Sequence, residues 1–258
     1  GPLFVRQRFG IARMVQRTLE IYKLGDPPEQ PPSPSEKSDD LALLDRHLFK
    51  VMANMLRSEG AQASGLYAYY EARINKDLCA LTAYDRMLFN YALAHFDRER
   101  RRIVHAGTGI GTLPSALAVA GYTVAGIECD APRFIAANRL RAALASAWPA
   151  AIERYELIAG EFPTVLDGSH WRSPETVLIF TNCGAGWPED LTMRAIASLP
   201  AFGDVILDAR LFGNVRDTPE ERKILIGQME AEGLIATPIA QSPPMTFYYH
   251  LRPVRVAR

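Results

Sequence analysis

The sequence predicts an α/β protein built on a mostly parallel sheet, with a helical extension ahead of it. Residues 103–128 read as an apolar run, a glycine-rich turn, a helix-compatible stretch and a second apolar run that ends in Glu128. From there to residue 232, short apolar runs alternate with helical patterns. This alternation is typical of parallel strands that are joined by crossover helices.

The apolar runs predict seven strands, of which the last two are expected to pair as an antiparallel hairpin at the edge of the sheet. These strands are Ile103–Ala106, Tyr122–Ile127, Tyr155–Ala159, Thr176–Phe180, Asp204–Leu207, Ile235–Ile239 and Met245–Leu251. Helices are expected over 113–120, 131–147, 188–199 and 218–232. Because the fourth strand is continuously apolar, we expect helices to cover both faces of the sheet.

The chain is predicted to divide into four segments. Residues 25–40 carry five prolines and almost no apolar side chains, which indicates an extended linker. Ahead of it, residues 1–24 mix apolar residues and arginines at helical spacing. This helix is expected either to lie on a membrane surface or to dock on the protein or a partner. Residues 41–100 predict a cap of about three helices, and residues 101–258 the α/β core.

Composition limits the function classes. Lys plus Arg equals Asp plus Glu, at 29 each, so no net field favours a nucleic-acid substrate. The three cysteines, Cys79, Cys129 and Cys183, lie far apart, so we expect neither a disulfide framework nor a metal site, and a cytoplasmic location. No apolar run is long enough to span a bilayer. The Gly1-Pro2 start resembles the remnant of a removed tag, which is compatible with an excised part of a longer protein.

The chemistry is expected where the first two strands end. Gly107, Gly109 and Gly111 allow a ligand to approach the backbone closely and tolerate positive φ angles. Glu128 stands at the tip of the second strand, where a carboxylate can accept hydrogen bonds from both hydroxyls of a ribose. The arrangement predicts a pocket for a nucleotide-like group at the carboxyl edge of the sheet.

These features resemble the class I S-adenosylmethionine (SAM) dependent methyltransferases over about residues 101–252. The resemblance rests on the glycine turn, Glu128, Gly160-Glu161-Phe162 and the terminal hairpin. It implies a seven-stranded sheet with the order 3-2-1-4-5-7-6, helices on both faces, and SAM as the cofactor. By this resemblance, Glu161 binds the adenine amino group, and the backbone or ring of Phe162 lies beside the base. The implied cofactor-binding residues are His105, Gly107, Thr108, Gly109, Gly111, Glu128, Cys129, Glu161, Phe162, Thr181 and Asn182.

One position departs from the family pattern. Where the family usually has Asp or Glu, two residues before the first glycine, this chain has His105. A histidine can accept a hydrogen bond through a neutral ring nitrogen, act as a base near its reference pKa of about 6.5, or simply pack at the sheet edge. The departure is also compatible with a chain that has lost catalysis.

The substrate is expected near the end of the fourth strand, at Thr181, Asn182 and Cys183. His105, Asn182, Asp208 and His250 are the candidate catalytic residues, with Asp208 or His250 as an alternative base. Tyr67, Tyr69 and Tyr70 either contribute to a lid over the cofactor or pack within the helical cap. The leading prediction is a methyltransferase for a small molecule, a glycan or a lipid-linked intermediate. The alternatives are a nicotinamide-dependent oxidoreductase and a non-catalytic scaffold module, and a homodimer is compatible with any of them.

Overall fold

The computed structural model describes residues 37–57, 70, 79–181, 183–184, 186–209, 212, 218–239 and 248–254. The chain divides into two compact units, residues 1–42 and 43–258. Of the first unit the structure describes only residues 37–42, which begin helix α3 (Lys37–Leu56). The predicted helix of residues 1–24 and most of the predicted linker therefore lie outside the described residues. Helix α3 itself begins at Lys37, inside the segment that the sequence assigned to the linker.

The second unit contains a seven-stranded sheet with the order β3-β2-β1-β4-β5-β7-β6, as the resemblance implied. The first five strands are parallel, and β7 runs antiparallel to β5 and to β6. The strands are β1 (Arg102–Ala106), β2 (Thr123–Glu128), β3 (Tyr155–Ala159), β4 (Thr176–Phe180), β5 (Asp204–Asp208), β6 (Leu234–Pro238) and β7 (Tyr248–Pro253). The carboxyl ends of the parallel strands thus share one edge of the sheet, which we call the carboxyl edge.

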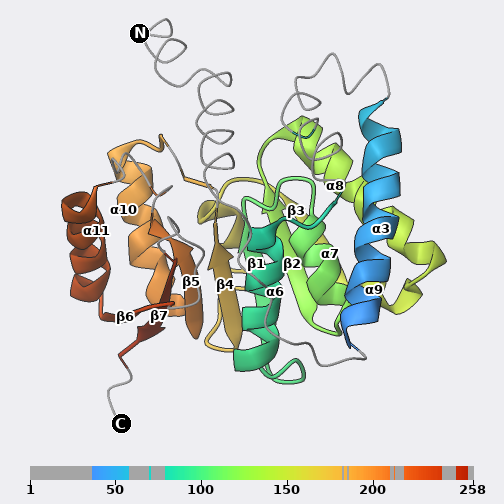
Figure 1. Cartoon of the computed structure of the whole chain (residues 1–258). Coiled ribbons are helices and arrows are strands. Elements are labelled where there is room, and N and C mark those ends of the chain that lie inside the picture. Colours follow the sequence, from blue (N-terminus) through green and yellow to red (C-terminus); the bar gives the residue numbers. More distant parts are fainter. Residues whose placement is uncertain are drawn as a thin grey trace, which may run out of the picture. The chain divides into compact units, whose positions relative to one another are not determined.

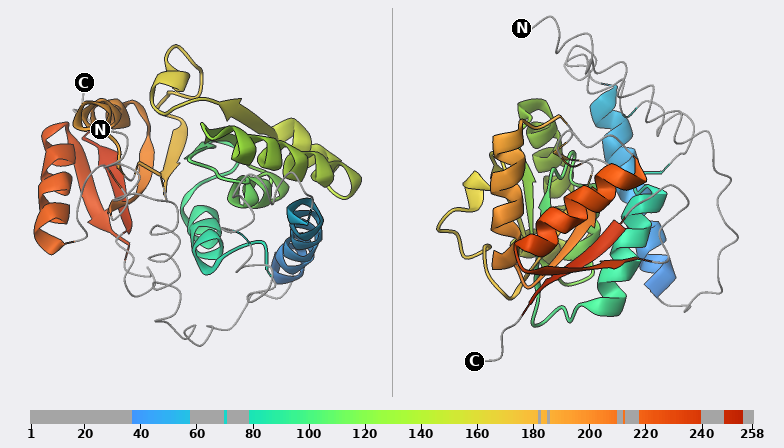
Figure 2. Two further views of the ribbon diagram at one scale, coloured as in Figure 1. Left: turned by 90° about the horizontal axis from the view of Figure 1, so that it is seen from above. Right: turned by 90° about the vertical axis from the view of Figure 1, so that its left-hand side faces the viewer.

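Helices cover the sheet on both faces, since every residue of β4 and β5 is buried. Figures 1 and 2 show α10 and α11 together beside β5 and β6, and α7, α8 and α9 at the other end of the sheet. Besides α3, the helices that the described residues of this unit form are α6 (Ala83–His95), α7 (Thr112–Val119), α8 (Ala131–Ala143), α9 (Pro149–Arg154), α10 (Glu189–Ser198) and α11 (Pro219–Ala231). Short 3₁₀ turns span η2 (Leu144–Ser146), η3 (Thr164–Leu166) and η4 (Leu199–Ala201).

The predicted capping box at the start of α6 is confirmed. Thr82 Oγ1 accepts a hydrogen bond from Asp85 N at 3.0 Å, and Asp85 Oδ2 accepts one from Thr82 N at 2.8 Å. Together they satisfy backbone donors that the first turn of a helix otherwise leaves without partners. Thr218 likewise caps α11 by accepting from Glu221 N at 3.2 Å.

Helix α9 was not predicted. It is short, and it opens with Pro149 in its first turn, where the missing N–H costs nothing. Its only buried residue is Ala151, so it has no apolar stripe that a periodicity search could detect. Among the described residues, no helix is both long enough and apolar enough to cross a membrane.

Candidate active site

The glycine turn, residues 107–111, joins β1 to α7 at the carboxyl edge. Gly107 and Gly111 both adopt left-handed conformations, with φ of 69° and 81°. A Cβ built on Gly107 would lie 2.3 Å from Cys183 Cβ, and one built on Gly111 would lie 2.5 Å from Tyr155 Oη. Glycine is therefore required here by both backbone conformation and close packing. A ligand that binds at this turn would therefore contact backbone atoms.

We expect Gly111→Ala to lower the free energy of unfolding by about 2 kcal/mol or more, since it adds a clash with Tyr155 to the strain of positive φ. Gly233→Ala is the matched control: Gly233 has φ of 82°, but nothing lies within 4 Å of its added Cβ. Urea unfolding of both variants measures the difference. Equal losses of unfolding free energy in the two variants would show that Tyr155 can move away from the added Cβ without an energetic cost.

Glu128 links the end of β2 to the glycine turn. Its side chain is buried, and Oε2 accepts a hydrogen bond from Gly109 N at 2.8 Å while Oε1 accepts one from Asp130 N at 2.9 Å. Each carboxylate oxygen has two acceptor positions, so both oxygens retain one for a ligand hydroxyl. The neighbouring Cys129 is exposed at this edge. The pKa of its thiol is raised, first because the sulfur is partly buried and second because the Glu128 carboxylate is nearby.

His105, at the end of β1, is buried between two hydroxyl groups. Its Nε2 lies 3.2 Å from Thr181 Oγ1 and its Nδ1 lies 3.4 Å from Thr108 Oγ1. Burial lowers the pKa of His105 to about 4, although the Asp85 carboxylate opposes that shift. At neutral pH the ring is therefore uncharged. It is a poor base and carries no charge with which to bind an ion.

The loop after β4 packs directly onto the glycine turn, because β4 and β1 are neighbours in the sheet. Cys183 Sγ donates to Ala106 O at 3.2 Å, and its Cβ contacts Gly107. Burial raises the pKa of the Cys183 thiol well above its usual range, so the group is a protonated packing element rather than a nucleophile. Thr181 is buried beside His105, and Asn182 lies outside the described residues.

Glu161 and Phe162 follow β3, which pairs with β2 at the same edge. Glu161 is exposed, with its side chain open to the solvent. The ring of Phe162 instead lies in the core, with its centroid 5.3 Å from that of Phe180 and 6.3 Å from that of Phe202. The ring of Phe162 is thus part of the core, and the backbone contact that the resemblance also implied stays a prediction.

Two tyrosines contact the glycine turn. Tyr155 begins β3 and is fully buried, and burial raises the pKa of its hydroxyl. In the sequence, Tyr155 is only the first residue of a predicted strand, and no local signal marks it as part of the site. Tyr70, one of the three tyrosines considered for a lid, is buried; a Cβ added to Gly109 would lie 3.1 Å from its hydroxyl. Tyr67 and Tyr69 lie outside the described residues.

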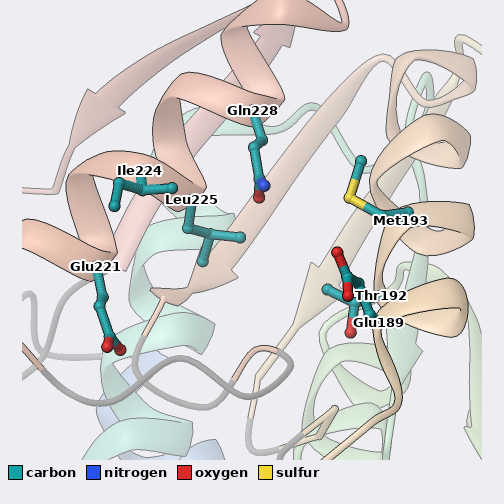
Figure 3. Close-up of a pocket in the computed structure, with 7 residues that line it drawn as sticks. All are labelled: Glu189, Thr192, Met193, Glu221, Ile224, Leu225 and Gln228. Atoms are coloured by element: carbon teal, nitrogen blue, oxygen red, sulfur yellow. The ribbon is translucent and has the colours of Figure 1, made fainter.

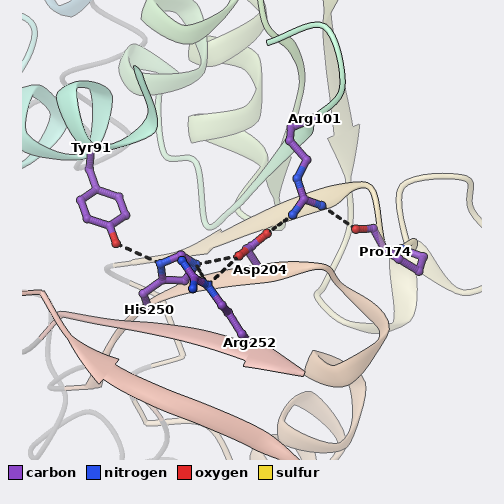
Figure 4. A network of polar contacts seen from close by, with 6 residues as sticks. All are labelled: Tyr91, Arg101, Pro174, Asp204, His250 and Arg252. Carbon is purple, nitrogen blue, oxygen red and sulfur yellow. Dashed lines mark hydrogen bonds and ion pairs between the residues drawn. The ribbon is translucent and has the colours of Figure 1, made fainter. Parts of the chain in front are cut away.

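The structure does not bring the two predicted alternative bases together. Asp208 is buried at the carboxyl end of β5, on the side of the glycine turn. His250 instead contacts Asp204, the first residue of β5, and therefore belongs to the opposite edge. Figure 4 shows its ring between Tyr91 and Asp204, with Tyr91 Oη 2.9 Å from Nδ1 and Asp204 Oδ1 2.8 Å from Nε2. Arg101 and Arg252 also pair with Asp204. This set is a polar network around the buried Asp204 and His250, separate from the turn.

A groove of about 270 Å³ lies between α10 and α11, and none of the predicted site residues lines it. Met193 and Ile224 form its apolar walls, and Glu189 and Glu221 lie at the start of its two helices (Figure 3). It is therefore a feature of the outer helical layer and not of the predicted cofactor site.

No protein-family model and no curated protein sequence matches this chain. Solved structures, by contrast, do match this chain. A TehB-like SAM-dependent methyltransferase from Corynebacterium glutamicum aligns over 76% of this chain and 99% of its own, with 16% identity and a TM-score of 0.50. The methyltransferase domain of bacterial CtHen1-C aligns over 66% of this chain and 96% of its own, with 13% identity and a TM-score of 0.52. Together with the strand order, these alignments show that the chain has the Rossmann-like fold of class I SAM-dependent methyltransferases.

Proposed function

We propose that this protein is a SAM-dependent methyltransferase. The observation that carries the proposal is the buried Glu128 carboxylate, which is fixed against the backbone of the glycine turn at the carboxyl edge. A carboxylate held in this way is pre-organised to accept two neighbouring hydroxyls without further loss of side-chain entropy. Gly107, Gly109 and Gly111 have no side chains of their own, and glycine tolerates the positive φ angles that they adopt. The donors and acceptors present therefore fit an adenosyl group.

Each predicted binding residue receives a role in this proposal. Glu128 binds the ribose hydroxyls, Glu161 the adenine amino group, and the backbone of Phe162 lies beside the base. Glu161 is exposed and its Cα follows the strand next to Glu128, which supports this arrangement. Thr108 lies within the turn, and Cys129 directly follows Glu128 at the end of β2. The glycine turn and Thr181 then lie toward the amino-acid end of the ligand.

When bound, SAM supplies a methyl group on a sulfonium, which is already a good leaving group. The protein has to hold the acceptor in line with that methyl group and exclude water. Where the acceptor is a hydroxyl, its proton must also be removed. Asp208 and Asn182 are the proposed groups for this end of the site, because Asp208 ends β5 and Asn182 comes two residues after the end of β4. The uncharged His105 can accept a hydrogen bond but, with a pKa of about 4, is a weak base at neutral pH.

For the methyl acceptor we propose a small molecule, a glycan or a lipid-linked intermediate. The equal numbers of acidic and basic residues support a substrate other than nucleic acid. Cys129 and Cys183 are free thiols, which supports a reducing compartment such as the cytoplasm. A peripheral membrane or partner contact through residues 3–24 stays a prediction, and so does a homodimer.

Calorimetric titration with SAM, S-adenosylhomocysteine and NADH tests the proposal. We expect the first two to bind and Glu128→Ala to weaken both by about 1–3 kcal/mol, since the ribose hydroxyls lose a buried acceptor. Glu175→Ala is the control, because that exposed carboxylate precedes β4 at the opposite edge. Thermal unfolding of each variant checks that the turn is intact.

Two results would argue for other functions, and a third would change only the role of Glu128. Binding of NADH alone would favour an oxidoreductase. Binding of none of the three ligands would favour a scaffold module. If SAM binds tightly and Glu128→Ala leaves its affinity unchanged, SAM is the cofactor but Glu128 does not bind its ribose.

A further inference from the structure

The amino-acid end of SAM carries an ammonium group, which needs a negatively charged partner once it leaves water. The order of the strands indicates where this end lies. The acid proposed for adenine follows β3 and the acid proposed for the ribose ends β2, so the ligand extends from β3 across β2 toward β1 and α7. At the end of β1 stands His105, which is buried between hydroxyl groups and uncharged. The end of β1 therefore supplies no charge for the ammonium group.

A carboxylate reaches this region from the helical cap. Asp85 lies in the first turn of α6, and its Oδ2 accepts a hydrogen bond from Thr112 Oγ1 at 3.4 Å. Thr112 is the first residue of α7 and follows Gly111 directly, so Asp85 stands at the end of the glycine turn. Burial lowers the pKa of His105, and the negative charge of Asp85 opposes this effect by a smaller amount. Asp85 is therefore close enough to the buried ring to interact with it electrostatically. The cap meets the turn a second time through Tyr70, beside Gly109.

We propose that Asp85 binds the ammonium group of the methionine part of SAM and so supplies, from α6, the negative charge that β1 lacks. This inference rests on the proposed function. It assigns the helical cap a direct part in cofactor binding.

The role of Asp85 in the capping box is compatible with this second role. An ionised carboxylate can accept about four hydrogen bonds, so one that holds the start of a helix can also bind a cation. The capping bond from Thr82 N fixes the side chain before the ligand arrives, which lowers the entropy cost of binding. Asp85→Asn keeps an oxygen for the cap and removes only the charge, so it is a clean probe.

The test compares two ligands that differ only in the amino-acid end. S-adenosylhomocysteine carries the ammonium group, and 5′-methylthioadenosine lacks it. We expect Asp85→Asn to raise the dissociation constant of S-adenosylhomocysteine by about 10- to 100-fold, the scale of a charge-assisted hydrogen bond. The dissociation constant of 5′-methylthioadenosine should change by less than about threefold. Isothermal titration calorimetry measures both.

Thr82→Ala is the matched control, since it removes the hydroxyl that caps the same helix and retains the Asp85 carboxylate. We expect it to lower the thermal stability and to change neither dissociation constant by more than about threefold. Equal weakening of both ligands by Asp85→Asn would overturn the inference and assign Asp85 a role in folding of the cap. An unchanged affinity for S-adenosylhomocysteine would also overturn it while leaving the proposed function intact. Failure of the unmodified protein to bind any adenosyl ligand would overturn both.

Discussion

Asp204→Ala is expected to lower the free energy of unfolding by about 3–5 kcal/mol at neutral pH, the scale for removing one partner of a buried ion pair. The carboxylate is buried at the start of β5 and accepts a hydrogen bond from His250 Nε2 at 2.8 Å. It also pairs with the guanidinium groups of Arg101 and Arg252. Its removal leaves the buried imidazole without its acceptor and Arg101 without its counter-charge. Urea unfolding followed by circular dichroism measures the loss.

Asp190→Ala provides the control for this prediction. Asp190 pairs with Arg194 at 3.5 Å on the surface of α10, and both side chains are exposed. Such a pair contributes about 0.5 kcal/mol or less. Equal effects of the two substitutions would mean that the network of Figure 4 adds no more to stability than a surface pair.

The dependence of stability on pH in the acid range gives a second test of the contribution of Asp204. Burial raises the pKa of Asp204, but His250, Arg101 and Arg252 together hold it below its usual value. The contribution of a carboxylate with a lowered pKa is present above the unfolded-state value, near 4, and is lost as the pH falls through the folded value. The difference between wild type and Asp204→Ala should therefore shrink below pH 4. A constant difference down to pH 2 would contradict the lowered pKa.

The strands and their parallel arrangement could be predicted because the signals that define them are local, whereas their order in the sheet was implied only by the family resemblance. Glycines and an acid at the ends of successive apolar runs mark the crossover units, and Thr82 and Asp85 mark the start of α6 within four residues of sequence. The parallel arrangement follows from these units, since a helix between two strands returns the chain to the same edge. The seven-stranded sheet confirms that expectation.

The contacts across the site could not be predicted in the same way, because they join residues that lie far apart in the chain. Tyr155 reaches Gly111 only because β3 lies beside β2, and its sequence context is that of any buried strand residue. His250 and Asp204 are 46 residues apart and meet through the antiparallel pairing of β7 with β5. From the sequence, His250 could be placed on a strand but not at one edge of the sheet. The residue range of a strand does not specify its register against a neighbouring strand, so it does not specify which residues its side chains contact.

His105 is expected to give the largest change of stability with pH between pH 6.5 and pH 4. In the unfolded chain a histidine takes up a proton near pH 6.5, whereas burial keeps His105 uncharged down to about pH 4. Across this window the unfolded state binds one more proton than the folded state, so stability falls as the pH falls. Across the full window, the free energy of unfolding is expected to fall by about 3 kcal/mol. His105→Gln keeps a polar side chain between Thr108 and Thr181 and has no proton to gain.

The measurement is urea unfolding of wild type and His105→Gln at intervals from pH 7 to pH 4. The absolute stability of the variant at pH 7 depends on how well the amide fits between the two hydroxyls, so the comparison rests on the slopes. We expect wild type to lose about 3 kcal/mol more than the variant as the pH falls across this window. Asp204 does not interfere, because it titrates below the window in the folded state and near its lower limit in the unfolded chain. Parallel curves would mean that the His105 imidazole protonates in the folded protein as readily as in water, and its hydrogen bonds to Thr108 and Thr181 would then have to rearrange below pH 6.5.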